Sequence, residues 1–203
     1  GSGSGKTTLI QMLQADLGSD RVTIISQDDY YLPIEQQCHD KNGEVNFDLP
    51  EGVDEVQLKS DIETIASGEE VKIKRYTFNN PNQLANEISL RPNPILIVEG
   101  LFVFHYEALR SFFDLTVFVD ASASTRYSRR LNRDTIERGY SEETIQYQWE
   151  NHVEPAFRDF LLPYHSQCDI AIDNEQDMAK GIGEVMEHLH SIPQLHHSVK
   201  QGD

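Results

Sequence analysis

The sequence predicts an α/β fold of three layers, in which helices cover both faces of a mostly parallel sheet. The first observation is that short apolar segments alternate with helical segments, as they do in repeated βαβ units. The second is that VTIIS (22–26), ILIV (95–98) and LTVFV (115–119) are apolar without alternation, which is typical of strands buried on both faces. The third is the start of the chain, GSGSGKTT (1–8), where a glycine-rich turn leads directly into a helical pattern.

Apolar spacing, and the residues that interrupt it, define each element in turn. From Lys6 apolar residues recur every three or four positions, and Gly18 ends this helix. Apolar and polar residues alternate over 71–78, as in a half-exposed strand. Pro155 should break the helix that begins near Ser141. The predicted order is helix 6–17, strand 22–26, helix 53–67, strand 71–78, strand 95–100, strand 115–120, helix 122–137, helix from 141, strand 168–173 and helix 177–190.

The segments between these elements predict a single domain over residues 1–203, because no shift in composition marks a second one. A small β-rich insertion that binds substrate is expected at about 30–92, and a lid at about 130–142. The last residues, about 191–203, are expected to form a loose tail.

The composition restricts the classes of partner. The chain carries 34 acidic and 17 basic residues, a formal net charge of −17, and such a chain repels nucleic acid except at locally basic patches. No apolar run approaches the roughly 20 residues that span a bilayer. The two cysteines, Cys38 and Cys168, are too few for a disulfide framework. We therefore expect a cytoplasmic protein that binds neither nucleic acid nor membrane.

The first eight residues support two interpretations. GSGSG is the composition of a flexible engineered linker, but Gly5-Lys6-Thr7 is also the end of the phosphate-binding pattern G-x-x-x-x-G-K-[ST], whose first glycine would precede Gly1. A phosphate loop must be followed by a helix, as this segment is, so the second interpretation is favoured. Because a phosphate loop hangs from a strand, we also expect a strand upstream of Gly1. The residues expected to surround phosphate are Gly1, Ser2, Gly3, Ser4, Gly5, Lys6, Thr7 and Thr8.

Two carboxylates follow predicted strands. Asp28 comes just after the strand 22–26, and Glu99 ends the strand that begins at Ile95. In open parallel sheets ligands gather beyond the carboxyl ends of strands, so these acids could serve Mg²⁺ and accept a proton. Asp28 could instead be an ordinary turn residue, whereas a carboxylate after four buried apolar residues needs a partner. Asp120 also follows a strand, and there we expect a helix cap.

The basic residues are concentrated in one stretch, TRYSRRLNRDTIERG (125–139). A cation cluster on an acidic chain indicates a site for a small anion, or else a solvated helix face whose arginines pair with nearby carboxylates. Charge alone does not distinguish these two interpretations.

Several motifs together resemble the uridine–cytidine kinase family, within the phosphoribulokinase and uridine kinase group of P-loop kinases. They are SQDDYY (26–31), NFDLPEGVD (46–54), VKIKRYTF (71–78), ILIVEGLFVF (95–104), VFVDASASTRYSRRLNRDTIERG (117–139) and EPAFRDFLLPY (154–164). The resemblance implies a P-loop NTPase-type fold and the transfer of phosphate from ATP, with Mg²⁺, to the 5′-hydroxyl of uridine or cytidine. It also implies a homo-oligomer, either a dimer or a tetramer.

The same resemblance implies roles for individual residues. Asp28 would be the general base, and Lys6 and Arg133 would act on the transferred phosphate. Thr7 and Glu99, with Asp28, would serve the metal. Arg133 and Arg138 of the lid would meet ATP phosphates. The substrate positions would be Asp28, Tyr31, Phe47, Asp48, Tyr76, Phe78, Arg130 and Gln148.

The sequence departs from the family pattern where the base would be recognised. Pro81 stands in place of a histidine, Gln83 in place of an arginine, and Tyr140 in place of a lid arginine. Proline cannot donate a hydrogen bond. The acceptor could therefore be another hydroxylated metabolite, as in phosphoribulokinase or pantothenate kinase. A non-catalytic nucleotide-binding module is the third hypothesis, against which the complete set of catalytic residues argues.

Overall fold

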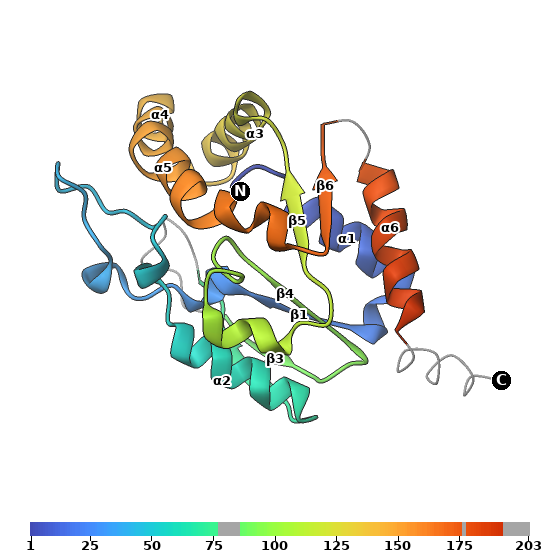
Figure 1. Cartoon of the computed structure of the whole chain (residues 1–203). Helices are drawn as coiled ribbons and strands as arrows, with labels where there is room; N and C mark the ends of the chain where they lie inside the picture. The colour runs from blue at the N-terminus through green and yellow to red at the C-terminus, as the bar shows by residue number, and fades with distance from the viewer. Residues whose placement is uncertain (77–85, 176–177, 193–203) are drawn as a thin grey trace.

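A computed structural model of the chain describes residues 1–76, 86–175 and 178–192. Strands lie at its centre, and helices pack on both sides of them (Figure 1). Strand β1 (Val22–Ser26) pairs in parallel with β4 (Ile95–Glu99), and β5 (Val117–Asp120) pairs in parallel with β6 (Ile170–Asp173). Strands β2 (Val71–Lys74) and β3 (Glu87–Leu90) form an antiparallel hairpin. The predicted α/β class with mostly parallel strands is confirmed.

Among the described residues, β4 and β5 do not pair with each other. Both strands line a cavity of about 940 Å³, whose walls also include Leu9, Ile10 and Leu13 of the first helix. The strand expected upstream of Gly1 concerns residues outside this sequence, and it stays a prediction.

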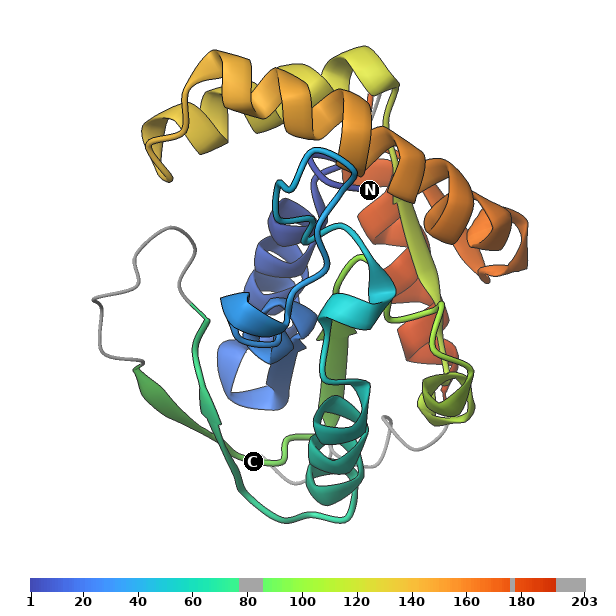
Figure 2. The same cartoon turned by 90° about the vertical axis from the view of Figure 1, so that its left-hand side faces the viewer.

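The helices divide into three groups. Helices α1 (Lys6–Leu17) and α6 (Met178–Ser191) pack together beside β5 and β6, whereas α2 (Glu55–Ala66) lies beneath β1 and β4 (Figure 1). The third group is α3 (Ala123–Ile136), α4 (Glu142–Gln148) and α5 (Glu154–Ala156), which crosses above the ends of β1 and β4 (Figure 2). This third group roofs the carboxyl edge of the parallel strands, where ligands collect in α/β folds.

The prediction that Pro155 breaks the fourth helix is wrong. A π-helical turn, Trp149–Val153, leads into α5, and a second one, Phe157–Leu161, leads out of it. The wider turns accommodate a residue that has no N–H to donate, so the helix continues past the proline. The expected cap at Asp120 is also wrong, because the Ser122 side chain accepts the Thr125 N–H at the start of α3.

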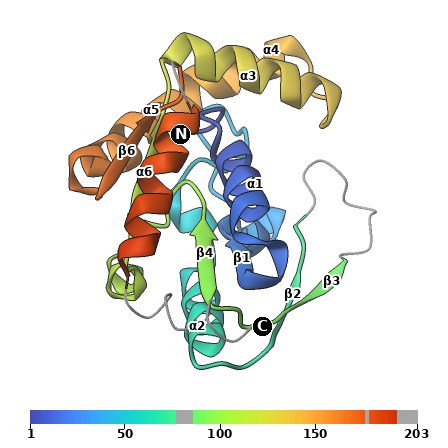
Figure 3. The same cartoon turned by 90° about the vertical axis from the view of Figure 1, so that its right-hand side faces the viewer.

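The β2–β3 hairpin projects from the body of the molecule on the side of β1 (Figure 3). The predicted strand 71–78 is shorter than expected, since β2 ends at Lys74 and residues from 77 lie outside the described part. Two apolar cores hold the elements in place. One joins α2, β1 and the segment after β4, and the other joins α1, β5, β6 and α6.

Candidate active site

The glycine-rich segment wraps around the N-terminus of α1 as a phosphate loop would. Gly3 and Gly5 have φ angles of 76° and 103°, in the left-handed region that favours glycine. The Lys6 ammonium group lies 3.5 Å from the Gly1 carbonyl oxygen, folded back over the loop. The Asn174 amide donates to the Ser4 carbonyl oxygen at 2.6 Å, so the turn after β6 holds the loop from behind. The backbone N–H groups at the start of α1 are thereby left to face an anion.

We expect Gly3→Ala to destabilise the chain and to abolish phosphate binding by the loop. A Cβ at this position would lie 2.3 Å from the carbonyl oxygen of Arg126, which is backbone and cannot step aside. Gly68→Ala is the matched control, since Gly68 has a similar φ of 92° and nothing lies within 4 Å of its Cβ position. The control should cost about 1 kcal/mol in the free energy of unfolding. Thermal unfolding with and without Mg-ATP measures both effects, and equal losses in the two variants would contradict the prediction.

Two acids stand at the ends of β1 and β4. The register pairs Ser26 with Glu99, and the Ser26 hydroxyl donates to the Glu99 carboxylate. Burial raises the pKa of Glu99 above its usual value, and the Lys6 charge and the Ser26 hydrogen bond offset only part of this rise. Asp28 lies in the turn Gln27–Tyr30 directly after β1. Thr7, Glu99 and Asp28 offer the oxygen donors that Mg²⁺ takes together with substrate phosphates and water, so the residues fit this ion.

Arg126 and Arg130 of α3 do not belong to a solvated helix face, whereas Arg129 of the same helix is exposed. Arg130 and Arg126 are 7% and 2% exposed, and Arg130 donates to the Ser2 hydroxyl at 3.0 Å and to the Gln148 side chain at 2.9 Å. Arg126 is paired with Glu154 at 2.7 Å and packs on the rings of Trp149 and Phe157. Arg126 therefore supports the fold, whereas Arg130 joins the phosphate loop to α4.

Asp134, which was not among the residues predicted from the sequence, gathers three arginines around one carboxylate. Its side chain is 0% exposed, and it lies 2.7 Å from Arg133, 3.2 Å from Arg130 and 3.5 Å from Arg138. The signal was present in the sequence, because Asp134 is four residues after Arg130 and four before Arg138. A buried acid with three cationic partners can fix guanidinium groups at the pocket edge.

A second group of predicted site residues consists of aromatic side chains and one buried acid. Tyr31, Phe47 and Tyr76 form a cluster with ring centroids 5.5–6.4 Å apart. Asp48 beside them is 7% exposed. Burial raises the pKa of Asp48, and Arg130 and then His152 lower it. A buried carboxylate of this kind can accept hydrogen bonds from the hydroxyl groups of a ligand.

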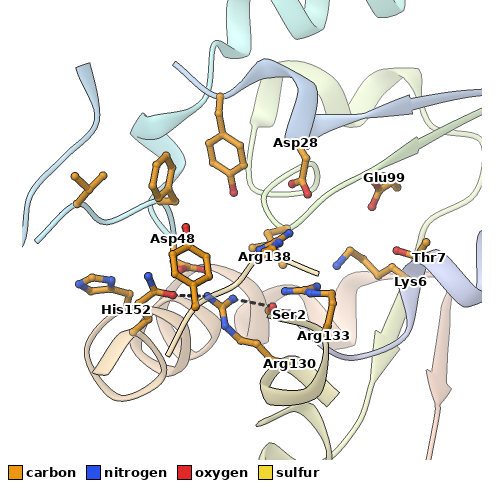
Figure 4. Close-up of a pocket in the computed structure, with 16 residues that line it drawn as sticks. Ser2, Lys6, Thr7, Asp28, Asp48, Glu99, Arg130, Arg133, Arg138 and His152 are labelled. Atoms are coloured by element: carbon orange, nitrogen blue, oxygen red, sulfur yellow. Dashed lines mark hydrogen bonds between the residues drawn. The ribbon is translucent and has the colours of Figure 1, made fainter. Parts of the chain in front are cut away.

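One pocket collects most of the predicted site residues (Figure 4). Lys6, Thr7 and Glu99 lie at one end, Asp48 and His152 at the other, and Asp28 lies between the two ends with the arginines Arg133 and Arg138 facing it. The predicted residues that line it are Ser2, Lys6, Thr7, Asp28, Tyr31, Phe47, Asp48, Glu99, Arg130, Arg133, Arg138 and Gln148.

The remaining predicted residues lie outside that lining. Tyr76 contacts the pocket through Tyr31 and Phe47, and Phe78 is outside the described residues, as are Pro81 and Gln83. The residues Gly1, Gly3, Ser4, Gly5 and Thr8 belong to the loop and the first turn of α1. Four further lining residues were not predicted as site residues, namely Val45, Leu101, Tyr140 and His152.

Comparison with known proteins shows the family of this chain. The model of the phosphoribulokinase / uridine kinase family matches residues 1–179. The chain belongs to this family. As a member of the phosphoribulokinase / uridine kinase family, it is 32% identical to uridine-cytidine kinase B of Dictyostelium discoideum, over 94% of this chain and 79% of that protein. It is 34% identical to a uridine kinase of Staphylococcus haemolyticus, over 85% and 83% of the two chains.

This chain also matches relatives that are longer than itself. It is 33% identical to uridine kinase-like protein 3 of Arabidopsis thaliana over 94% of its own length, but it spans only 41% of that relative. Among solved structures, a possible uridine kinase from Bacillus stearothermophilus has a TM-score of 0.56 and covers 84% and 83% of the two chains. Phosphoribulokinase from Rhodobacter spheroides has a TM-score of 0.57 and covers 85% and 67%. Both are 16% identical to this chain, and they support the P-loop kinase fold alone.

None of the helices in the described residues combines the length and the apolar character that a membrane span requires. The expectation of a cytoplasmic protein, like that of a dimer or tetramer, stays a prediction.

Proposed function

We propose that the chain phosphorylates the 5′-hydroxyl group of a pyrimidine nucleoside, uridine or cytidine, with ATP as the phosphate donor. The observation that carries this proposal is the order of groups along the pocket. A phosphate loop with Lys6 occupies one end and a buried acid, Asp48, occupies the other, with Asp28 between them. This order suits ATP with its phosphates at the loop and an acceptor bound at Asp48. The acceptor hydroxyl group would then meet the terminal phosphate of ATP near Asp28.

The transfer follows from these positions. Lys6 and the loop would hold the β- and γ-phosphates, and Asp48 would accept hydrogen bonds from the ribose hydroxyl groups. Asp28 would take the 5′-hydroxyl proton while the new oxygen–phosphorus bond forms and the bond to the ADP oxygen breaks. Arg133 and Arg138 would neutralise the charge that develops on the transferred group. Mg²⁺, held through Thr7, Glu99 and Asp28, supplies further neutralisation of the phosphates when it is bound.

The alternative acceptor is another hydroxylated metabolite, such as a sugar phosphate or pantothenate. Pro81 favours it, because this side chain offers no hydrogen bond where the family pattern has a histidine. The test is a Mg-ATP activity screen over uridine, cytidine, pantothenate and sugar phosphates, read as ADP release and as phosphorylated product. Turnover with a nucleoside supports the proposal, and turnover with a different alcohol alone overturns it. Absence of turnover with every acceptor would favour the non-catalytic nucleotide-binding module.

A further inference from the structure

A hydrogen-bonded cluster of Asp40, Tyr147 and His152 joins two segments at the acceptor end of the pocket. The Asp40 Oδ2 atom accepts from the Tyr147 hydroxyl at 2.5 Å and lies 2.8 Å from His152 Nε2. Its Oδ1 atom accepts the backbone N–H groups of Asn42 and Glu44 at 2.8 and 3.0 Å. The backbone of its own turn thus fixes one oxygen of the carboxylate. The other oxygen contacts Tyr147 of α4 and His152 of the π-helical turn that follows.

These contacts define the orientation of the His152 ring. The hydrogen bonds from Tyr147 and His152 lower the pKa of Asp40, and an ionised carboxylate only accepts, so His152 Nε2 carries the proton and donates. The His152 side chain is 2% exposed, and the ring of Tyr147 stands across it at an angle of 90°. A ring held in this way keeps one tautomer, which leaves Nδ1 as its other polar atom.

His152 also lines the pocket, whereas Tyr147 is not among its lining residues in the described part of the chain. Figure 4 shows His152 at the end farthest from Lys6 and beyond Asp48. Among the other residues that line the pocket, Val45 and Phe47 are apolar, and the Gln148 side-chain amide oxygen already accepts from Arg130. A ligand that reaches past Asp48 therefore meets a planar, oriented imidazole.

We infer that His152 is a specificity-determining residue that contacts the base of the acceptor, and that Asp40 is the positioning residue that orients it. The inference rests on the proposed function, in which a nucleoside places its ribose at Asp48 and its base beyond. Uridine and cytidine differ in the donors and acceptors on the edge of the pyrimidine ring. A single oriented imidazole can discriminate between such edges, because the wrong base leaves a buried polar group unpaired.

The test compares kcat/KM for uridine and cytidine in three variants. Tyr147→Phe removes one hydrogen bond to Asp40 without changing the pocket lining, so it should lower both values alike and keep their ratio. His152→Phe removes the imidazole at similar size, and the ratio should change about tenfold. His152→Gln can still donate to Asp40 and holds the wall together, and its ratio should also change. Thermal unfolding of each variant reports whether the fold is kept, and His152→Gln decides the outcome if His152→Phe does not fold.

A ratio that stays at the wild-type value in the folded His152 variants overturns this inference and leaves the proposed function standing. A wild-type chain that phosphorylates neither nucleoside overturns the proposed function, and the inference with it. The two failures are therefore distinguished by the wild-type measurement alone.

Discussion

Asp28→Asn is expected to lower kcat with a nucleoside acceptor by about 100-fold or more. It should weaken Mg-ATP binding much less than it lowers kcat, because Lys6, Thr7 and Glu99 remain in place. The carboxylate lies between the phosphate loop and Asp48, where the acceptor hydroxyl group would lose its proton. An amide of the same shape cannot take that proton, and general-base catalysis typically contributes a factor of about 10² to 10⁴. Steady-state kinetics with titrated Mg-ATP gives both quantities.

The control for this prediction is Asp16→Asn, the same change of charge on the exposed face of α1. It should leave kcat and KM within about twofold of the wild type, because surface substitutions away from a site have small effects. Turnover by Asp28→Asn at the wild-type rate would refute the assignment of Asp28 as the base. A large loss of Mg-ATP binding would instead indicate that Asp28 acts mainly through the metal.

Asp134→Asn is expected to destabilise the chain by about 3 kcal/mol and to lower kcat as well. The substitution removes the carboxylate charge that lies 2.7–3.5 Å from Arg130, Arg133 and Arg138, and it does so at a position that is 0% exposed. Breaking a buried ion pair from one side costs about 3–5 kcal/mol, because the other charge remains buried. For a chain of this size a loss of about 3 kcal/mol lowers Tm by about 6–12 °C.

The structure offers a matched control for Asp134 at its surface. Arg158 and Asp159 are also adjacent in sequence, with Nε and Oδ1 3.1 Å apart, but their side chains are 69% and 55% exposed. Asp159→Asn should therefore change the free energy of unfolding by less than about 1 kcal/mol. Calorimetry or denaturant unfolding of both variants tests the comparison. Equal and small losses would show that Asp134 does not organise the three arginines.

Part of the fold and part of the site could be predicted from local patterns in the sequence. They predicted the phosphate loop and α1, because glycine conformations and helix periodicity depend on residues that are close in sequence. They also predicted where the strands end, and this placed Asp28 and Glu99 at one edge of a parallel sheet. In the structure Lys6, Thr7 and both acids line one pocket. The resemblance to a kinase family added Asp48 and Gln148, whose positions in the chain give no chemical signal of their own, and it gave Arg130 of the basic stretch a role at the substrate.

The sequence by itself determined the α/β class, the phosphate loop and the family to which the chain belongs. Only the tertiary structure distinguished the roles of the arginines: Arg126 packs between aromatic rings, while Asp134 gathers Arg130, Arg133 and Arg138. It also brought Asp40 to His152 across 112 residues of chain, a contact that no local pattern predicts. The physical reason is that such contacts depend on burial and on the packing of distant segments, which periodicity and spacing along one segment do not encode.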